Sequence, residues 1–261
     1  MSDLDLWIGT SWKMNKTLAE AKNFSEALRE TEKCADPRIQ RFVIPPFTVA
    51  REVKEMLAET QALVGAQNMH WEDAGPWTGE VSAPMLVDCR LDIVELGHSE
   101  RRTHFGETDE MIGLKVSAAI RNGLVPLICV GETQSEKTAG QADAALARQI
   151  AGALAWLPEN RVSRVLIAYE PVWAIGADGQ PADPAYANAR QAMIKSEAAN
   201  WLGTEPHCLY GGSVTTSNCT ALIAQPNVDG LFVGRAAWDA SGYLEILRLC
   251  TVEISRRRTR M

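Results

Sequence analysis

The sequence predicts an α/β protein that folds as a single (β/α)8 barrel, and three observations lead to this fold. Short, nearly continuous apolar runs recur along the chain, as expected of parallel strands buried on both faces. Amphipathic stretches with apolar residues at helical spacing separate these runs. Eight such units follow one another with no linker and no shift in composition, which favours one closed barrel.

The eight expected strands leave room for a helix between each pair. They cover residues 6–12, 41–47, 62–68, 91–97, 124–132, 164–171, 207–213 and 229–236. Residues 17–33 and 184–203 are examples of the helical pattern between them. A doubly wound open sheet is the alternative, but the segment GTSWKMN after the first strand lacks the GxGxxG turn of that fold. We therefore expect one domain over residues 1–261, with a flexible basic tail from about residue 252.

Composition and charge exclude several classes of function. A hydrophobic content of 46% with 23% charged residues describes a globular protein able to bury a core. The net charge of −7 argues against a nucleic-acid binder, since phosphate neutralisation needs clustered Lys and Arg. No apolar run reaches membrane-spanning length, and the segment MSDLDLW does not resemble a signal peptide. The six cysteines form no CxxC pair and no metal-like group with histidine, so reduced thiols in the cytoplasm are expected.

Polar or glycine residues follow every expected strand, and in a (β/α)8 barrel these strand ends share the face that carries the active site. Glu170 closes the sixth strand. A carboxylate at such a position is most often structural, but burial between Tyr169 and Pro171 would raise its pKa and suit it to act as a general base. Lys13 follows the first strand. It is either a solvated surface lysine or a fixed positive charge for an anion at the mouth of the barrel.

His98 follows the fourth strand, where a lone histidine is most often a packing residue. We expect Ser99 to cap the helix that begins there, with Glu100 in its first turn. An imidazole at a helix N-terminus has its cationic form disfavoured, which would leave a neutral hydrogen-bond donor.

Glycines and a serine end the sixth, seventh and eighth units. Gly176, Gly211, Gly212 and Gly234, with Ser213, are either simple turn residues or a set of backbone N–H groups for a phosphate. Each of these signals is weak alone, and their occurrence on one expected face is a stronger indication of a site.

Eight motifs carry a resemblance that covers nearly the whole chain. GTSWKMN, GAQN, TGEVS, ELGHSERRTHFGE, ICVGET, AYEPVWAIG, YGGSV and DGLFVG occur in the order typical of the triosephosphate isomerase family. The resemblance implies a TIM barrel in which Glu170 moves a proton between adjacent carbons and His98 polarises the carbonyl. It also implies that Lys13 supplies positive charge and that Glu100 is a supporting acid paired with Lys13. An internal proton transfer needs neither a metal nor an organic cofactor, so we expect none.

The resemblance also implies a small phosphorylated sugar as substrate and a second subunit. The residues expected to hold the phosphate are Gly176, Ser213, Gly234 and the backbone of Arg235. Cys129 matches a supporting position behind Glu170, and the loop over residues 75–82 matches one that docks into a partner, with Thr78 reaching the partner's site. A homodimer is therefore expected.

Three departures from the family lie around the expected substrate pocket. Ser11 stands where the family has Asn, which opens space beside the reacting end of the substrate. The lid sequence GADGQPA is one residue longer than the family's GTGKTA and ends its altered stretch, residues 177–181, with a proline. Arg235 takes the place of the second glycine of the phosphate turn, although its backbone N–H remains available.

These departures leave every chemical group in place and so indicate a changed substrate. The combination resembles the branch that acts in erythritol breakdown, the L-erythrulose-1-phosphate isomerases, which interconvert L-erythrulose 1-phosphate and D-erythrulose 4-phosphate. Two alternatives stay open: an ordinary triosephosphate isomerase, and a phosphate-binding barrel that has lost catalysis. The joint presence of Lys13, His98 and Glu170 argues against the second alternative.

Overall fold

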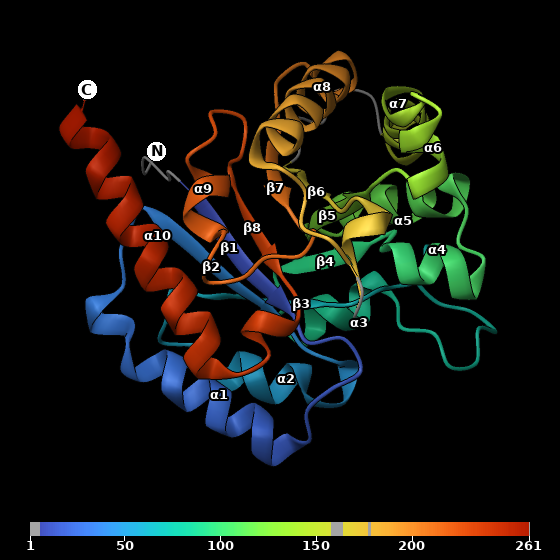
Figure 1. Cartoon of the computed structure of the whole chain (residues 1–261). Coiled ribbons are helices and arrows are strands. Elements are labelled where there is room, and N and C mark those ends of the chain that lie inside the picture. Colours follow the sequence, from blue (N-terminus) through green and yellow to red (C-terminus); the bar gives the residue numbers. More distant parts are fainter. Residues whose placement is uncertain (1–5, 158–163, 177–178, 261) are drawn as a thin grey trace.

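The strands of the protein close into a parallel barrel in the order of the sequence (Figure 1). The computed structural model describes residues 6–157, 164–176 and 179–260. The strands are β1 (Leu6–Ser11), β2 (Ile39–Ile44), β3 (Leu63–Ala66), β4 (Ile93–Leu96), β5 (Val125–Val130), β6 (Leu166–Tyr169), β7 (His207–Tyr210) and β8 (Gly230–Val233). Each pairs in parallel with the next, and β8 pairs with β1, so the expected single (β/α)8 TIM barrel is confirmed.

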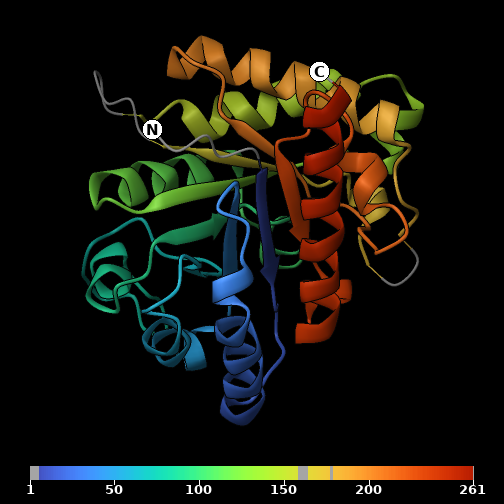
Figure 2. The same cartoon turned by 90° about the vertical axis from the view of Figure 1, so that its left-hand side faces the viewer.

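Helices connect the strands and form the outer layer of the molecule. They are α1 (Leu18–Glu30), α2 (Phe47–Met56), α3 (Ala83–Asp88), α4 (Ser99–Phe105), α5 (Asp109–Arg121), α6 (Gln134–Thr138), α7 (Ala142–Leu154), α8 (Pro184–Leu202), α9 (Cys219–Ile223) and α10 (Ala240–Arg260). Three short 3-10 turns, η1 (Glu32–Cys34), η2 (Val172–Ala174) and η3 (Arg235–Ala237), join them. Figure 2 shows α1 in blue and α10 in red alongside each other, where they pack together.

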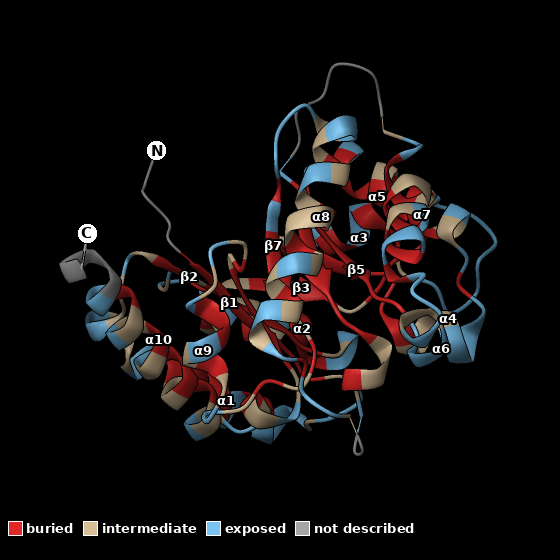
Figure 3. Cartoon of the chain, turned by 45° about the horizontal axis from the view of Figure 1, so that its top comes forward, coloured by how far each residue is buried: buried red, intermediate tan, exposed pale blue. Residues whose placement is uncertain are grey.

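Alternation along each strand separates the barrel interior from the layer under the helices. The interior cluster is made of residues from all strands except β3, with Leu63 of β3 packed against it: Trp7, Phe42, Ile44, Ile93, Leu127, Cys129, Leu166, Ala168, Leu209 and Phe232. Residues between these positions point outward to the helices, as the two-residue period of a strand requires. Figure 3 shows the result: buried strands at the centre and helices whose outer faces are exposed.

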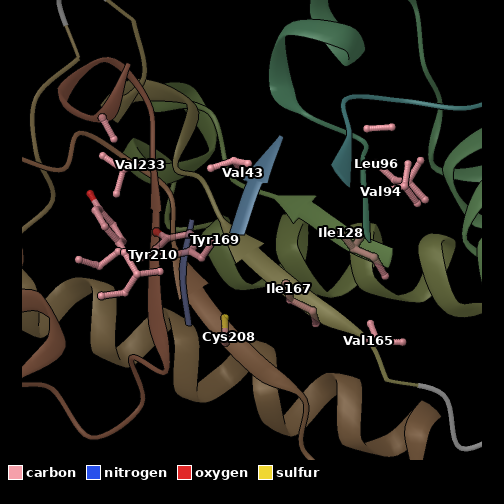
Figure 4. Packing of buried hydrophobic residues seen from close by; sticks show 14 of the residues in the cluster. Val43, Val94, Leu96, Ile128, Val165, Ile167, Tyr169, Cys208, Tyr210 and Val233 are labelled. Carbon is pink, nitrogen blue, oxygen red and sulfur yellow. The ribbon is translucent and has the colours of Figure 1, made fainter. Parts of the chain in front are cut away.

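The outward cluster is the larger one and binds the helices to the barrel. Ile128, Ile167 and Cys208 lie on three neighbouring strands, β5, β6 and β7, and belong to this cluster (Figure 4). Burial of such side chains contributes about 25 cal/mol per Å² of apolar surface. Adjacent Val and Ile side chains also favour the extended backbone, so sequence and packing agree on these strands.

Local signals explain where several helices begin and end. Thr17 caps α1 through a reciprocal hydrogen-bond pair with Glu20, which satisfies N–H groups that the first turn leaves free. Asp183 caps α8, whose first residue is a proline, and Gly203 ends that helix in the left-handed conformation. These caps hold α8 directly behind the segment that follows Glu170.

The C-terminal segment is helical, and its expected flexibility stays a prediction. Helix α10 continues to Arg260, and Ile254 is buried in the outward cluster together with Leu247 and Cys250. These three residues follow at helical spacing, so an apolar stripe carries the helix past residue 252 despite the basic run after it. Within the described ranges, no helix is both long and apolar enough to cross a membrane.

Candidate active site

A cavity of about 350 Å³ opens at the carboxyl ends of the strands. All the residues that the sequence singled out for catalysis or substrate binding line it: Ser11, Lys13, His98, Glu100, Glu170, Gly176, Ser213, Gly234 and Arg235. They come from the ends of β1, β4, β6, β7 and β8, which are far apart in the sequence. The structure therefore brings the predicted constellation together on the face where barrels carry their active sites.

Glu170 lines this cavity and stands directly after β6. Its backbone N–H donates to the Val130 carbonyl at 2.7 Å, which continues the strand ladder, and only 3% of the residue is exposed. Burial raises the pKa of the carboxyl well above its usual value, and the nearby charge of Glu95 raises it further. A hydrogen bond with the Cys129 thiol and the charge of Lys13 oppose this rise.

Gly211 makes room for the Glu170 side chain. A Cβ atom at this position would lie 2.7 Å from Cγ of Glu170 and 3.0 Å from its Oε1. Both distances are too short for a methyl group, so the glycine is required by the carboxylate beside it. The backbone N–H of Gly211 donates to the Tyr169 carbonyl at 2.8 Å and fixes the turn at this position.

His98 caps helix α4 with its own side chain. Its Nδ1 accepts a hydrogen bond from the Glu100 backbone N–H at 3.1 Å, whereas the sequence pointed to Ser99 as the cap. Ser99 is instead the first residue of the helix, because the imidazole of His98 accepts the free N–H group of the first turn. Since Nδ1 is an acceptor, the neutral ring carries its proton on Nε2.

The ring of His98 is held neutral and faces Glu170. Burial is the main cause that lowers its pKa, to about 4, and the positive charge of Lys13 adds to this effect. Its Nε2 lies 3.5 Å from Oε2 of Glu170, an oxygen with no hydrogen-bond partner of its own. A hydrogen-bond donor and a proton acceptor therefore face the same cavity side by side.

Lys13 and Glu100 form the expected pair. Nζ of Lys13 donates to Oε1 of Glu100 at 2.6 Å. Burial alone would raise the pKa of Glu100, but the hydrogen bond from Lys13 and the neighbouring charges lower it overall. Lys13 has a φ of 52°, which is uncommon for a residue other than glycine and typical of strain held at a functional site. The amide of Gln67 supports this backbone by donating to the Lys13 carbonyl at 2.9 Å.

The turns after β6, β7 and β8 supply further groups that line the cavity. Gly176 has a φ of 92°, a conformation that few other residues adopt. A Cβ at Gly212 would lie 2.3 Å from the Tyr210 hydroxyl, so the chain here passes too closely for a side chain. Gly234 precedes η3, and the side chain of Arg235 is exposed, which is how the turn accommodates a residue larger than glycine.

Both ends of the lid segment are anchored. On the first side, Trp173 Nε1 donates to Oε1 of Glu132 at 2.9 Å. On the second, the Ala182 N–H donates to the Tyr210 hydroxyl at 3.0 Å. Of the altered stretch 177–181, residues 177 and 178 lie outside the described residues.

Glu95 is the residue that the sequence reasoning missed. It lies on β4 with 3% of its surface exposed, and its Oε2 accepts a hydrogen bond of 2.8 Å from the Ser11 hydroxyl. Burial raises the pKa of this carboxyl to about 7, against the opposing hydrogen bond from Ser11. The signal was present in the sequence: Glu95 stands two residues after Ile93 and therefore points to the same interior face.

Glu95, His98 and Glu170 are also the group of described residues whose spacing could suit a metal ion, with ligand atoms within 4.8 Å of one another. The hydrogen bonding fits a metal poorly. With Nδ1 accepting from the backbone, the Nε2 that faces Glu170 carries the ring proton and has no lone pair to offer. This donor set suits proton transfer, and the absence of a metal cofactor stays a prediction.

Comparisons with known proteins identify the family. The family model described as triosephosphate isomerase matches residues 6–250. The chain belongs to the triosephosphate isomerase family. It is 60% identical over 249 residues to a Rhizobium rhizogenes protein, covering 95% of both chains, and 61% identical to a Rhizobium meliloti protein, covering 95% of this chain and 98% of the other. A Brucella abortus protein is 59% identical, with 95% and 97% covered. All three are named L-erythrulose-1-phosphate isomerase.

Ser11 and the loop over residues 75–82 are two further features that the sequence singled out. Trp238 Nε1 donates to the Ser11 carbonyl at 3.0 Å and, with the bond to Glu95, fixes the serine from two sides. A β-bridge between His70 and Ser82 flanks this loop, and Thr78 at its tip is exposed. An exposed tip is compatible with the predicted docking of Thr78 into a partner, which stays a prediction.

Proposed function

We propose that the protein is a sugar-phosphate isomerase that interconverts L-erythrulose 1-phosphate and D-erythrulose 4-phosphate by enediol proton transfer. The observation that carries this function is the juxtaposition of the buried Glu170 carboxyl with the neutral His98 ring, 3.5 Å apart in the lining of one cavity. A base of raised pKa beside a neutral hydrogen-bond donor is what the removal of a proton next to a carbonyl requires.

In this mechanism Glu170 takes the proton from the carbon next to the ketone of the bound sugar. His98 donates its Nε2–H to the carbonyl oxygen as negative charge develops there and takes the proton of the adjacent hydroxyl in return. Glu170 then delivers its proton to the former carbonyl carbon. Lys13 supplies fixed positive charge, and Glu100 holds its ammonium group in position through the 2.6 Å bond. No proton carrier beyond the chain's own residues is needed.

The phosphate is assigned to the glycine and serine turns after β6, β7 and β8. Gly176, Ser213, Gly234 and the backbone of Arg235 line it and add no acidic side chain. Backbone N–H groups in such turns bind anions, and barrels commonly use the loops after strands 7 and 8 for this purpose. The lid over Gly176 would then exclude water from the enediolate.

The tetrulose phosphates are favoured as substrates by the names of the relatives at about 60% identity. The substrate would be a triose phosphate extended by a hydroxymethyl group, and Ser11 provides the space beside the reacting carbon. Triosephosphate isomerase activity, with dihydroxyacetone phosphate as substrate, is the second candidate, since the same chemical groups serve it. A barrel without catalysis is disfavoured by the arrangement of His98 and Glu170.

A homodimer formed through residues 75–82 is part of the proposal. Sedimentation of the purified protein should give twice the mass of one chain. Thr78→Arg adds charge and bulk at the exposed tip, and should shift the measured mass toward that of a single chain. A single-chain mass for the unaltered protein would remove the dimer from the account. A cytoplasmic location stays a prediction.

The proposed substrate is tested by a side-by-side assay of purified protein on tetrulose and triose phosphates. The kcat/KM for L-erythrulose 1-phosphate should exceed that for D-glyceraldehyde 3-phosphate and for dihydroxyacetone phosphate. Residual triose activity is compatible with the proposal, because pocket volume alone discriminates one added carbon by roughly 10–200-fold. Equal or reversed preference would leave an ordinary triosephosphate isomerase.

A further inference from the structure

Glu95 occupies a position in the barrel where an apolar side chain would be expected. Along β4, Ile93 belongs to the interior cluster and Val94 and Leu96 to the outward one, so Glu95 points into the barrel above Ile93. The interior cluster to which Ile93 belongs is made of apolar residues and the Cys129 thiol. A carboxyl group placed here loses most of its hydration, which is unfavourable unless the group has a specific partner or task.

The surroundings of Glu95 make this burial more unfavourable still. Its carboxyl oxygen lies within 4.8 Å of one from Glu170, and two like charges at this distance oppose each other. The charged groups that face Glu95 are Lys13 from the β1 end, Glu100 and Arg101 from α4, and Glu170 from the β6 end, with neutral His98 and Cys129 beside it. Structural stability alone gives no reason for a carboxylate at this point.

The partner that Glu95 does have is the hydroxyl of Ser11, which lines the cavity. A serine hydroxyl has one proton to donate and lone pairs with which to accept. In the structure that proton is donated to Oε2 of Glu95, away from the cavity. The Ser11 oxygen therefore presents only lone pairs to a molecule bound in the cavity that His98 and Glu170 also line.

We propose that Glu95 is a specificity-determining positioning residue: by accepting the Ser11 proton, it makes Ser11 an acceptor for the hydroxyl of the substrate's terminal hydroxymethyl group. The inference rests on the proposed function, because that group is what distinguishes a tetrulose phosphate from a triose phosphate. It sits on the carbon from which Glu170 takes the proton, and hence beside Ser11. A triose phosphate has only a hydrogen atom at this place and leaves the acceptor unpaired.

The size of the discrimination separates this proposal from one based on space alone. Room for one more carbon group is worth roughly 10–200-fold, whereas a site built to hydrogen-bond a substrate hydroxyl rejects the analogue lacking it by about 10⁴–10⁵-fold. We therefore expect the preference of the unaltered protein for L-erythrulose 1-phosphate over dihydroxyacetone phosphate to exceed the first range.

The test measures the ratio of kcat/KM for these two substrates in each of four variants at pH 8. This pH lies above the Glu95 pKa of about 7, so most of the Glu95 side chains are carboxylates that accept. Glu95→Leu removes the acceptor, Ser11→Ala removes the hydroxyl, and the double variant removes both. Glu95→Gln is the matched control, because its amide oxygen can still accept the Ser11 proton while the charge is lost. A ratio measured within one variant is insensitive to an unfolded fraction, which lowers both activities equally.

Glu95→Leu and Ser11→Ala should each reduce the ratio to roughly the 10–200-fold range, and the double variant should reduce it no further. Glu95→Gln should keep the ratio and move the acid limb of kcat/KM for the tetrulose phosphate to lower pH, because Glu170 loses a like-charged neighbour. The phosphate group of the substrate titrates equally with the unaltered protein and with Glu95→Gln, so it cannot cause the difference between their acid limbs.

Single variants that keep the original ratio would overturn the role of Glu95 while leaving the proposed substrate intact, and so would an original ratio already within the range for space alone. A protein that prefers triose phosphates would instead overturn the proposed function, and this inference with it.

Discussion

The Nε2 atom of His98 lies 3.5 Å from Oε2 of Glu170, while Nδ1 of the same ring accepts the backbone N–H of Glu100. These two contacts fix both the tautomer and the direction of the ring. A neutral hydrogen-bond donor and a buried base thus lie next to each other in the cavity, although their positions in the sequence are far apart.

Activity should be lost as the pH falls, and this loss should occur at a higher pH than if the base were an exposed carboxyl. Glu170 must be ionised to act as a base, and burial together with the charge of Glu95 raises its pKa. The ionised fraction is therefore lost as the pH falls through this raised value, whereas His98, with a pKa of about 4, stays neutral over the same range. The measurement is kcat/KM against pH. A profile that stays flat down to the pKa of an exposed glutamate, about 4.3, would contradict the assignment.

Replacing His98 should slow the chemical step more than it weakens binding. His98→Asn removes the Nε2–H donor from the position of the developing oxyanion, and loss of one such donor typically lowers kcat by about 10²–10³-fold. Steady-state kinetics should show this fall in kcat with a smaller change in KM. A rise in KM at unchanged kcat would mean that His98 only binds the substrate.

Gly211→Ala should displace the base without touching it chemically. The added methyl group would meet Cγ of Glu170 at 2.7 Å, so the carboxylate must move. A shift of about 1 Å in a reacting group can cost about 10²-fold in rate. We expect kcat to fall by this order while inorganic phosphate still binds, as measured by calorimetry. Full activity in the variant would show that the position of Glu170 is not critical.

The fold and most of the site follow from the sequence, because apolar runs identify the strands and polar residues mark their ends. Glu95 was missed because its meaning depends on Ser11, which lies 84 residues away and becomes a partner only when the barrel closes. The helical end of α10 was missed for a different reason. The basic run at the terminus conceals the apolar stripe of Leu247, Cys250 and Ile254 that continues the helix.

Glu95 should make the stability of the protein fall as the pH rises. Its pKa is raised to about 7 in the folded state from an ordinary value of 4.5, so its favourable protonated form is lost on ionisation through that range. Glu95→Leu has no such group. Its free energy of unfolding, relative to that of the unaltered protein, should therefore rise by about 2–3 kcal/mol from pH 5 to pH 8. Urea unfolding at the two pH values measures this gain.

The control for this gain is Glu26→Leu, which alters an exposed side chain of α1 and should have the same effect at both pH values. If Glu95→Leu changed the free energy of unfolding equally at pH 5 and pH 8, the raised pKa of the buried Glu95 carboxyl would be contradicted.

The turnover of L-erythrulose 1-phosphate by Glu170→Gln tests the central claim most directly. The variant keeps the size of the side chain and the phosphate turns but cannot take a proton from carbon. The account predicts that the unaltered protein forms D-erythrulose 4-phosphate and that the variant does so slower by about 10²–10⁴-fold, with phosphate binding retained. Unchanged turnover in the variant, or no conversion by the unaltered protein, would contradict it.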